Sequence, residues 1–446
     1  MYDEETLDAL QESGGDTEYA SLPEQHRFVI PDGCHWQDVR ERTENLGSAI
    51  VGAMRGIELA NPDTLYGVLS MFSAQKWTDK KNLSDGKIRD LIEHLSTRKL
   101  GNKDYPTDLM GDAYEILLKK FADDSKAKAG EFYTPRSVVQ LLVRILDPQP
   151  GESVYDPACG SGGMLIEAVH HMNHSSLCCG NIFGQEKNVV NSAIAKMNLF
   201  LHGASDFNIM QGDTLRNPKI LQGGEVAKFD CVIANPPFSL EKWGSVEWSS
   251  DKYGRNIWGT PSDSCGDYAW IQHMIASMAP GKGRMAVVMP QGVLFRGNEE
   301  GRIREKLVKS DMVEAVVTLG EKLFYGTGLS PCFLIIRKMK PATHSARVLM
   351  IDGTKILTPK RAQNILEQKD VDQLFELYVN YENVEDFSQV VTLEDIAAKG
   401  YDLSPNKYVQ YHREAIKPYA EVLAAFKAAY EEVKLREAEF RNIINA

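Results

Sequence analysis

The strongest constraint on the fold of this chain is an alternation of short apolar segments with helical segments. The apolar segments, each long enough for one strand, span residues 153–155, 182–184, 229–234, 284–289, 312–319 and 332–337. Segments with helical spacing lie between them, at residues 164–171, 189–202 and 268–278. Such an alternation predicts an α/β fold with a parallel, doubly wound sheet.

The regions on either side of this alternation are predicted to be helical. Residues 1–125 contain apolar residues at roughly helical spacing: Leu91, Ile92, Leu95, Tyr114, Leu117, Leu118 and Phe121. Residues 413–446 predict one charged amphipathic helix, whose apolar seam repeats at alternating steps of three and four: Ile416, Tyr419, Leu423, Phe426, Tyr430 and Val433. Such a seam suits packing on the chain's own domain or contact with another chain, and its regular period favours the second. The sequence therefore predicts a helical domain at 1–125, an α/β domain at 126–412 and a contact helix at 413–446.

The bulk composition limits the location and the redox chemistry of the chain. Its formal net charge is −12. No apolar run is long enough to cross a membrane, and the acidic N-terminus lacks the apolar core of a signal peptide. We therefore expect a soluble, cytoplasmic protein. None of the seven cysteines forms a C-x-x-C pair, so neither a disulfide framework nor a metal site is expected. Cys159 and Cys231 are expected to be buried.

A glycine-rich segment follows the first strand, from Asp156 to Gly163. Glycines at this place allow a tight turn and a close approach of a ligand to the backbone. The N–H groups at the start of the next helix suit an anion such as a carboxylate or a phosphate. The loop therefore suits a nucleotide cofactor, although such a loop also serves as simple turn chemistry.

Two further acidic residues come at the ends of the next two strands. Glu186 ends the second strand, where a carboxylate can accept both ribose hydroxyls of a nucleoside. Asp213 follows the next strand end, where it can accept the amino group of an adenine. Each acid alone also suits a helix N-cap. With Asp156, they place an acid at three successive strand ends, and that edge is where open α/β sheets bind ligands.

The motif Asn235-Pro236-Pro237-Phe238 follows another apolar strand. Its prolines make a rigid turn that lacks two backbone donors, so the Asn235 side-chain carbonyl and the Pro236 backbone carbonyl remain as acceptors. An exocyclic amine is a poor nucleophile because its lone pair is delocalised into the ring. Two acceptors on its hydrogens favour a tetrahedral nitrogen with a localised lone pair, and Phe238 can stack on the base. The alternative is an Asn-Pro turn beside a core phenylalanine.

This arrangement indicates methyl transfer to an amine. A Pro-Cys motif that could attack a pyrimidine ring is absent, which disfavours methylation of a ring carbon. The sulfonium of S-adenosylmethionine is already activated, so the enzyme's work is positioning and electrostatics. A target base in DNA must leave the duplex to reach such a pocket.

An aromatic motif precedes the glycine-rich segment and consists of Glu131, Phe132, Tyr133, Thr134, Pro135 and Arg136. Aromatic rings there can attract a sulfonium through cation–π interaction. Thr134 is equally typical of a helix N-cap with Pro135 at the first helical position.

These motifs resemble the modification (M) subunit of type I restriction–modification systems, a family of N6-adenine DNA methyltransferases. The resemblance covers roughly residues 85–446 and rests on residues 130–163, 235–238, 266–270, 283–290, 328–333 and 403–408. It implies a Rossmann-like class I methyltransferase sheet, S-adenosyl-L-methionine as cofactor and a flipped adenine as substrate. It assigns catalysis to Asn235, Pro236 and Phe238, and cofactor contacts to residues 131–136, 161–163 and Glu186, with Asp156 and Asp213 in support.

The resemblance also implies partners. In this family a separate specificity (S) subunit chooses the DNA sequence, commonly with two M subunits bound, and a restriction (R) subunit can join. Such a partner would explain an acidic methyltransferase, because DNA binding otherwise needs basic surface on the chain itself. Family members usually begin with a longer helical domain, and residues 22–27 resemble a mid-domain segment. We therefore expect a truncated N-terminal domain.

Three other interpretations fit the motifs less well. A stand-alone DNA amino-methyltransferase, acting on adenine N6 or cytosine N4, needs its own target-recognition domain, and residues 340–412 are too short and insufficiently basic for one. Glutamine methylation of proteins suits an Asn-Pro-Pro-aromatic motif, but the helical N-terminus and the C-terminal seam argue against it. A scaffold with a dead pocket conflicts with the intact Glu186 and Asn235.

Overall fold

One large sheet organises the fold. The computed structural model describes residues 2–62, 64–65, 67–69, 77–98, 109, 111, 113–114, 116–117, 134–173, 181–204, 206–324, 330–361, 363–412 and 419–444. The strands are β1 (Val154–Asp156), β2 (Ile182–Glu186), β3 (Phe207–Gln211), β4 (Leu221–Gln222), β5 (Glu225–Val226), β6 (Cys231–Ala234), β7 (Arg284–Pro290), β8 (Val313–Leu319), β9 (Pro331–Arg337), β10 (Arg347–Gly353) and β11 (Ser388–Thr392). Within the described residues, the large sheet has the order β11-β10-β8-β9-β7-β6-β1-β2-β3, and β4 pairs with β5.

The sheet confirms the predicted α/β class but not the predicted direction of every strand. The pairs formed among β3, β2, β1, β6 and β7 are parallel. In contrast, β9 runs antiparallel to β7 and β8, and β11 runs antiparallel to β10. The prediction of a parallel sheet is therefore wrong for β9 and β11. Residues 320–330 alone connect β8 to β9, which is too short for the crossover that parallel neighbours need.

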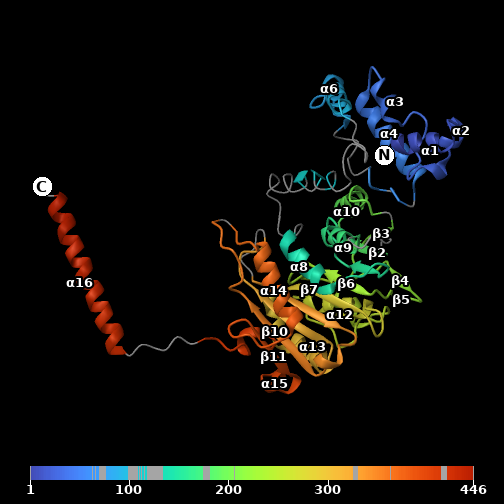
Figure 1. Cartoon of the computed structure of the whole chain (residues 1–446). Helices are drawn as coiled ribbons and strands as arrows, with labels where there is room; N and C mark the ends of the chain where they lie inside the picture. The colour runs from blue at the N-terminus through green and yellow to red at the C-terminus, as the bar shows by residue number, and fades with distance from the viewer. Residues whose placement is uncertain are drawn as a thin grey trace.

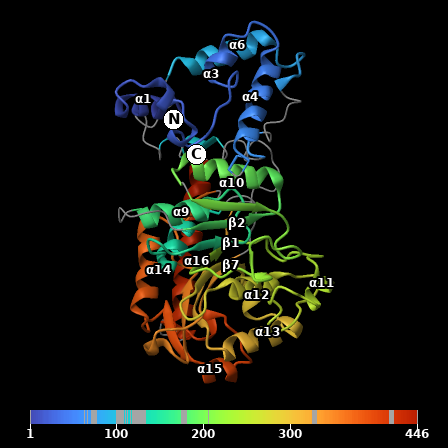
Figure 2. The same cartoon turned by 90° about the vertical axis from the view of Figure 1, so that its right-hand side faces the viewer.

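Helices cover both faces of the sheet (Figures 1 and 2). They are α8 (Arg136–Leu146), α9 (Gly163–Asn173), α10 (Val189–Leu201), α11 (Ser245–Ser249), α12 (Asp267–Ser277), α13 (Asn298–Lys309), α14 (Gln368–Asn380) and α15 (Leu393–Ala398). On one face, α8, α9, α10 and α14 pack on a core that includes Ile233 and Val288. On the other face, α12 and α13 pack on a core that includes Val232 and Val287. Successive strand residues enter opposite cores because strand side chains alternate in direction. Cys159 and Cys231 are buried, as predicted.

Helices precede the sheet in the chain: α1 (Tyr2–Glu12), α2 (Thr17–Ala20), α3 (Trp36–Arg40), α4 (Leu46–Ala60) and α6 (Asp85–Ser96). Of these, α3, α4 and α6 share a small core of Val39, Leu46, Ala53, Ile88 and Ile92. Phe28 packs edge-on against Phe200 of α10, with ring centroids 5.1 Å apart. The described part of residues 1–125 is thus largely helical. The boundary between residues 125 and 126 lies outside the described residues and stays a prediction.

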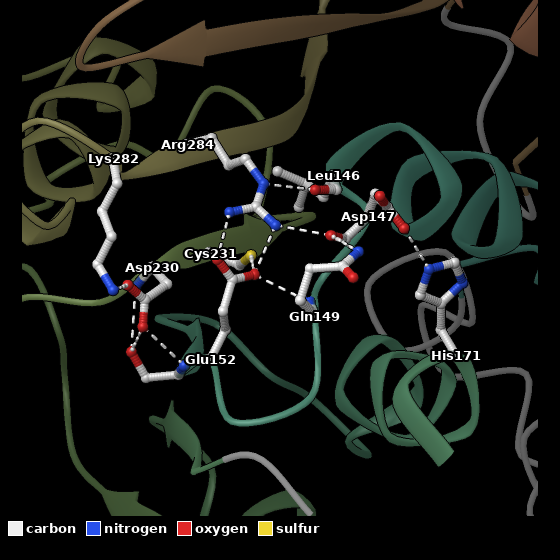
Figure 3. A network of polar contacts seen from close by, with 10 residues as sticks. Leu146, Asp147, Gln149, Glu152, His171, Asp230, Cys231, Lys282 and Arg284 are labelled. Atoms are coloured by element: carbon white, nitrogen blue, oxygen red, sulfur yellow. Dashed lines mark hydrogen bonds and ion pairs between the residues drawn. The ribbon is translucent and has the colours of Figure 1, made fainter. Parts of the chain in front are cut away.

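An arginine network holds α8 against the sheet (Figure 3). Arg284, the first residue of β7, donates hydrogen bonds to the carbonyl oxygens of Leu146 and Asp147 at 2.5 and 2.7 Å. It also donates to the Glu152 carboxylate at 2.6 Å. The two carbonyls end α8, where they lack partners within the helix and the helix dipole is negative. The guanidinium therefore fixes the C-terminal end of α8. Thr134 lies just before the N-terminal end of the same helix.

The final helix, α16 (Tyr419–Ile444), lies apart from the α/β domain (Figure 1). It falls within the predicted contact helix, of which residues 413–418 and 445–446 lie outside the described ones. Five apolar side chains that stand at seam spacing are exposed: Tyr419, Phe426, Tyr430, Val433 and Phe440. Nowhere in the described ranges is a helix both long and apolar enough to span a bilayer.

Candidate active site

The candidate site lies at the edge of the sheet where β6, β1, β2 and β3 end. These strands are neighbours and run parallel, so their carboxyl ends meet at one edge. Open α/β sheets bind their ligands at this edge. Asp156 ends β1, Glu186 ends β2, and Asn235 directly follows β6. The structure thus brings together motifs that lie far apart in the sequence.

The glycine-rich turn joins β1 to α9. Gly160 and Gly162 have φ values of +54° and +85°, a region that glycine enters without a steric penalty. A side chain at Gly162 would meet the backbone of Ala195 in α10 at 3.4 Å. Among the described residues, none accepts a hydrogen bond from the N–H of Ser161 or of Gly163. The start of α9 therefore offers two backbone donors to an anion.

Asp156 lies buried at the base of this turn, and only 2% of its surface is exposed. Its Oδ1 accepts a hydrogen bond of 2.9 Å from the N–H of Ala158. Burial raises the pKa of the Asp156 carboxyl to about 8, and the charge of Glu186 acts in the same direction. The carboxyl is thus mostly protonated at neutral pH and supports the turn without adding a buried charge.

Glu186 ties the end of β2 to the glycine-rich turn. Its Oε2 accepts a hydrogen bond of 3.0 Å from the N–H of Gly160, and its Oε1 accepts one of 2.7 Å from Asn188. Each carboxylate oxygen has room for a second donor. The Glu186 side chain therefore keeps the capacity to accept ribose hydroxyls.

Asp213 follows β3 and already has two partners. Its Oδ1 accepts a hydrogen bond of 3.2 Å from the N–H of Arg216, and its Oδ2 lies 2.8 Å from the Nζ of Lys187. The first contact has the geometry of a helix N-cap, which is the alternative role that the sequence allowed for Asp213. The predicted contact of Asp213 with an adenine stays a prediction.

Asn235 has one end of its side-chain amide bound and the other end unpartnered. Its Nδ2 donates a hydrogen bond of 2.9 Å to the Oγ1 of Thr134. Its Oδ1 is buried and accepts no hydrogen bond from any residue that the structure describes. A buried carbonyl without a donor is costly and rare in native proteins. Such an atom fits a site that a ligand's donor completes.

The rest of the Asn-Pro-Pro-Phe turn is half-buried. Pro236 is buried, whereas Pro237 is exposed. The Phe238 ring is partly exposed and lies 6.4 Å from the Phe324 ring, centroid to centroid, at an angle of 54°. One part of this ring therefore packs on the core, and the other part remains available to stack on a base.

The helix α8 begins one residue later than predicted. Pro135 is the N-cap and Arg136 is the first helical residue. The prediction of Thr134 as the cap is wrong, because Pro135 takes that position, and the Thr134 hydroxyl instead accepts the bond from Asn235. Thr134, Arg136 and Gly163 help to line a cavity of about 40 Å³ that extends between α8 and α9 as far as His170 and His202. Glu131, Phe132 and Tyr133 lie outside the described residues.

Sequence reasoning missed a buried arginine that supports this edge. Arg255 donates hydrogen bonds of 2.9 Å to the carbonyl oxygens of Thr214 and Leu215, and its charge is balanced by Asp251 at 2.6 Å. Thr214 donates to the carbonyl oxygen of Pro157 at 2.7 Å. Arg255 thus fixes the segment after β3 against the glycine-rich turn. The spacing of four between Asp251 and Arg255 is its only sequence signal, and that spacing is common on helices.

One cluster of potential metal ligands lies near the site. The ligand atoms of Cys265, Asp267 and Glu300 lie within 4.8 Å of one another. The guanidinium of Arg296 contacts both carboxylates. Because this cation already occupies the position between the acids, the cluster is an ion-pair network rather than a metal centre.

Comparison with known proteins relates the site to one family. A model of the N-6 DNA Methylase family matches residues 105–416. The chain is 31% identical over 444 residues to the type I restriction enzyme MjaIX methylase subunit of Methanocaldococcus jannaschii, covering 94% of this chain and 77% of that protein. It is 35% identical over 333 residues to the MjaVII methylase subunit of the same organism, covering 72% of this chain and 56% of that protein. The chain therefore matches little more than half the length of the second relative.

Solved structures agree with these relatives. The type I restriction-modification system methyltransferase subunit from Streptococcus thermophilus is similar, with a TM-score of 0.74 and 25% sequence identity. The similarity covers 91% of this chain and 86% of that one. The shared fold therefore extends over most of both chains.

Proposed function

The chain belongs to the N-6 DNA methylase family and, within it, to the type I restriction enzyme methylase subunits, and from that premise we propose that it transfers a methyl group from S-adenosylmethionine to the N6 amine of a flipped adenine in DNA. The observation that carries the proposal is the buried Oδ1 of Asn235, which has no donor among the described residues. An exocyclic amine of adenine is the donor that this oxygen would take.

The chemistry of the turn follows from its acceptors. The Oδ1 of Asn235 and the backbone carbonyl of Pro236 would both accept hydrogens of the adenine amine. This contact draws the nitrogen lone pair out of the ring and favours the positive charge that develops on nitrogen in the transition state. Phe238 would stack on the base and hold its plane. Thr134 fixes the amide of Asn235 with its oxygen free for the amine.

The strand-end residues fit the proposed cofactor. S-adenosylmethionine, when bound, supplies a methyl group that its sulfonium already activates. The free N–H groups of Ser161 and Gly163 suit its carboxylate, and Glu186 suits its ribose hydroxyls. Asp213 would reach its adenine. Phe132 and Tyr133 stay candidates for contact with the sulfonium.

The exposed seam of α16 supports a role as one subunit of a larger complex. Its apolar residues include Tyr419 and Phe426, which are 79% and 65% exposed. We infer that they pack on helices of a specificity subunit, which would choose the DNA sequence and bind two copies of this chain. A restriction subunit would join the same complex. The net charge of −12 supports a partner that brings basic surface to the DNA. The relatives are named as subunits, which disfavours a stand-alone enzyme.

One assay tests this proposal. The purified chain, with and without a specificity subunit from the same organism, is incubated with DNA and S-adenosylmethionine labelled in its methyl group. We expect N6-methyladenine at one defined sequence only when both polypeptides are present. Efficient methylation of a defined site by the chain alone would refute the subunit role, and methylation of cytosine would refute the adenine assignment.

A further inference from the structure

The turn that carries Asn235 is followed at once by a residue in an unusual backbone conformation. Ser239, directly after Phe238, has a φ of +50°, a left-handed region that non-glycine residues enter rarely. Its N–H donates a hydrogen bond of 2.7 Å to the Oδ1 of Asp267. Such conformations persist where the surrounding structure imposes them. The Asp267 carboxylate is the group that binds the backbone at this point.

Asp267 is built into a buried ion-pair network. It is the first residue of α12 and is fully buried. Its Oδ1 holds the N–H of Ser239, and its Oδ2 binds the guanidinium of Arg296. Arg296 is held in turn by Glu300, whose Oε2 lies 2.5 Å from its Nε. The guanidinium compensates the buried negative charges, which would otherwise be costly. One carboxylate thus joins the ion pair to the backbone of the turn.

The segment that leads into α12 also holds the residues that follow Ser239. The N–H of Gly266 donates a hydrogen bond of 2.9 Å to the carbonyl oxygen of Leu240, and the N–H of Lys242 donates one of 2.8 Å to the carbonyl oxygen of Asp263. The chain after Phe238 is therefore fixed to the segment that leads into α12. At the other end of the turn, Asn235 is fixed by β6 and by its bond to Thr134. The turn is clamped at both ends.

We propose that Asp267 is a positioning residue for methyl transfer, because its carboxylate fixes the exit of the Asn-Pro-Pro-Phe turn through the N–H of Ser239. It acts through the turn, since its own oxygens are occupied by Ser239 and Arg296. The charge of the carboxylate strengthens the bond to the backbone. This inference rests on the proposed function, in which Asn235 and Phe238 of the same turn engage the adenine.

The test uses the complex with the specificity subunit and DNA that the wild-type complex methylates. We expect Asp267→Ala to lower kcat on the order of 100-fold, because a small misplacement of reacting groups is costly. The KM for S-adenosylmethionine should stay unchanged, because Asp267 contacts Ser239 and Arg296 and none of the proposed cofactor residues. Asp267→Asn keeps an oxygen for Ser239 and should restore most of kcat. Glu300→Gln is the matched control, since Glu300 binds Arg296 but not the turn, and its kcat should stay near that of the wild type.

Hydrogen exchange supplies a second readout. The amide of Ser239 should exchange faster in Asp267→Ala than in Glu300→Gln, as mass spectrometry of peptides that span residues 238–242 would report. In Asp267→Ala, Arg296 keeps Glu300 as its partner. If Asp267→Ala fails to fold, Asp267→Leu replaces it in the test, because leucine fills the space but cannot bind the N–H of Ser239. Wild-type kcat in Asp267→Ala, unchanged exchange at Ser239, or equal losses in kcat and cofactor affinity would each overturn the proposal. Full activity of Asn235→Ala would instead refute the proposed function, whatever Asp267 does.

Discussion

The side-chain nitrogen of Asn235 lies 2.9 Å from the Oγ1 of Thr134, to which it donates a hydrogen bond, although 101 positions separate the two residues. The contact joins the end of β6 to the segment that leads into α8. This hydrogen bond engages the Nδ2 of Asn235, whereas its Oδ1 has no donor among the described residues. Thr134 therefore orients the central acceptor of the site.

Removal of the Thr134 hydroxyl should weaken the orientation of the Asn235 side-chain oxygen. Thr134→Val keeps the shape of the side chain but cannot accept the bond from Asn235. We expect the rate of methyl transfer by the complete complex to fall about 3-fold to 10-fold, since one neutral hydrogen bond contributes about 1 kcal/mol. Labelled-methyl transfer under single-turnover conditions measures this rate. Thr134→Ser keeps the oxygen and serves as control, and equal rates in the two variants would show that the bond is unimportant.

The buried Asp156 should make the stability of the chain depend on pH. Burial raises the pKa of this carboxyl from 3.8 to about 8, so between these values the folded state holds a proton that the unfolded state has lost. Stability therefore falls as pH rises through this window, by up to about 1.4 kcal/mol per pH unit, and levels off above it. Asp156→Asn cannot titrate at this position. Its free energy of unfolding should therefore rise relative to that of the wild type between pH 5 and pH 7.5. Urea unfolding at several pH values measures both, and a constant difference would contradict the protonated Asp156.

The network of Figure 3 should matter for stability rather than for chemistry. Arg284→Met removes the donor for the carbonyl oxygens of Leu146 and Asp147 and for the Glu152 carboxylate. We expect a loss of about 3 kcal/mol in the free energy of unfolding, because a largely buried carboxylate loses its partner. Lys282→Met is the control, since the Lys282 side chain is 68% exposed and Asp230 keeps two hydrogen bonds from Ser153, so its loss should stay below about 1 kcal/mol. Equal losses in urea unfolding would count against this role of Arg284.

The seam of α16 should bind the partner subunit. Phe426→Lys places a charge on the seam, whereas Ala425→Lys places the same charge on a neighbouring position outside it. We expect the first variant to weaken binding of the specificity subunit on the order of 100-fold, because large aromatic residues dominate such interfaces, and the second to change it little. Analytical ultracentrifugation of the mixed subunits measures the binding. Methyl transfer should fall in parallel, and binding that survives Phe426→Lys would place the interface elsewhere.

Much of the sheet could be predicted because its strands are short apolar runs with clear helical segments between them. The strand ends at Asp156, Glu186 and Asn235 followed from this alternation, since carboxyl ends of parallel neighbours share an edge. The antiparallel β9 could not be predicted from its apolar composition, because a buried strand has the same pattern in either direction. The length of the connection before β9 carried the only signal.

The supporting residues were less predictable than the motifs. The bond between Thr134 and Asn235 depends on how α8 sits on the sheet, and Thr134 alone had the pattern of a helix cap. Arg255 and Asp267 are charged residues whose partners are set by tertiary contacts, so no local spacing marks them as buried. The contacts of Arg255 join the loops after β3 and β6, and those of Asp267 join the segments after β6 and β7.

The central claim is that the oxygen of Asn235 acts on the adenine amine, and Asn235→Ala tests it most directly. The variant complex is compared with wild type and with Asn380→Ala, an exposed asparagine on α14, for labelled-methyl transfer to DNA and for binding of S-adenosylmethionine. We predict that Asn235→Ala lowers methyl transfer on the order of 1000-fold and leaves the cofactor Kd within about 3-fold of wild type, since Asn235 lies outside the glycine-rich turn and the ends of β2 and β3. Methyl transfer by Asn235→Ala at the wild-type rate would contradict the account.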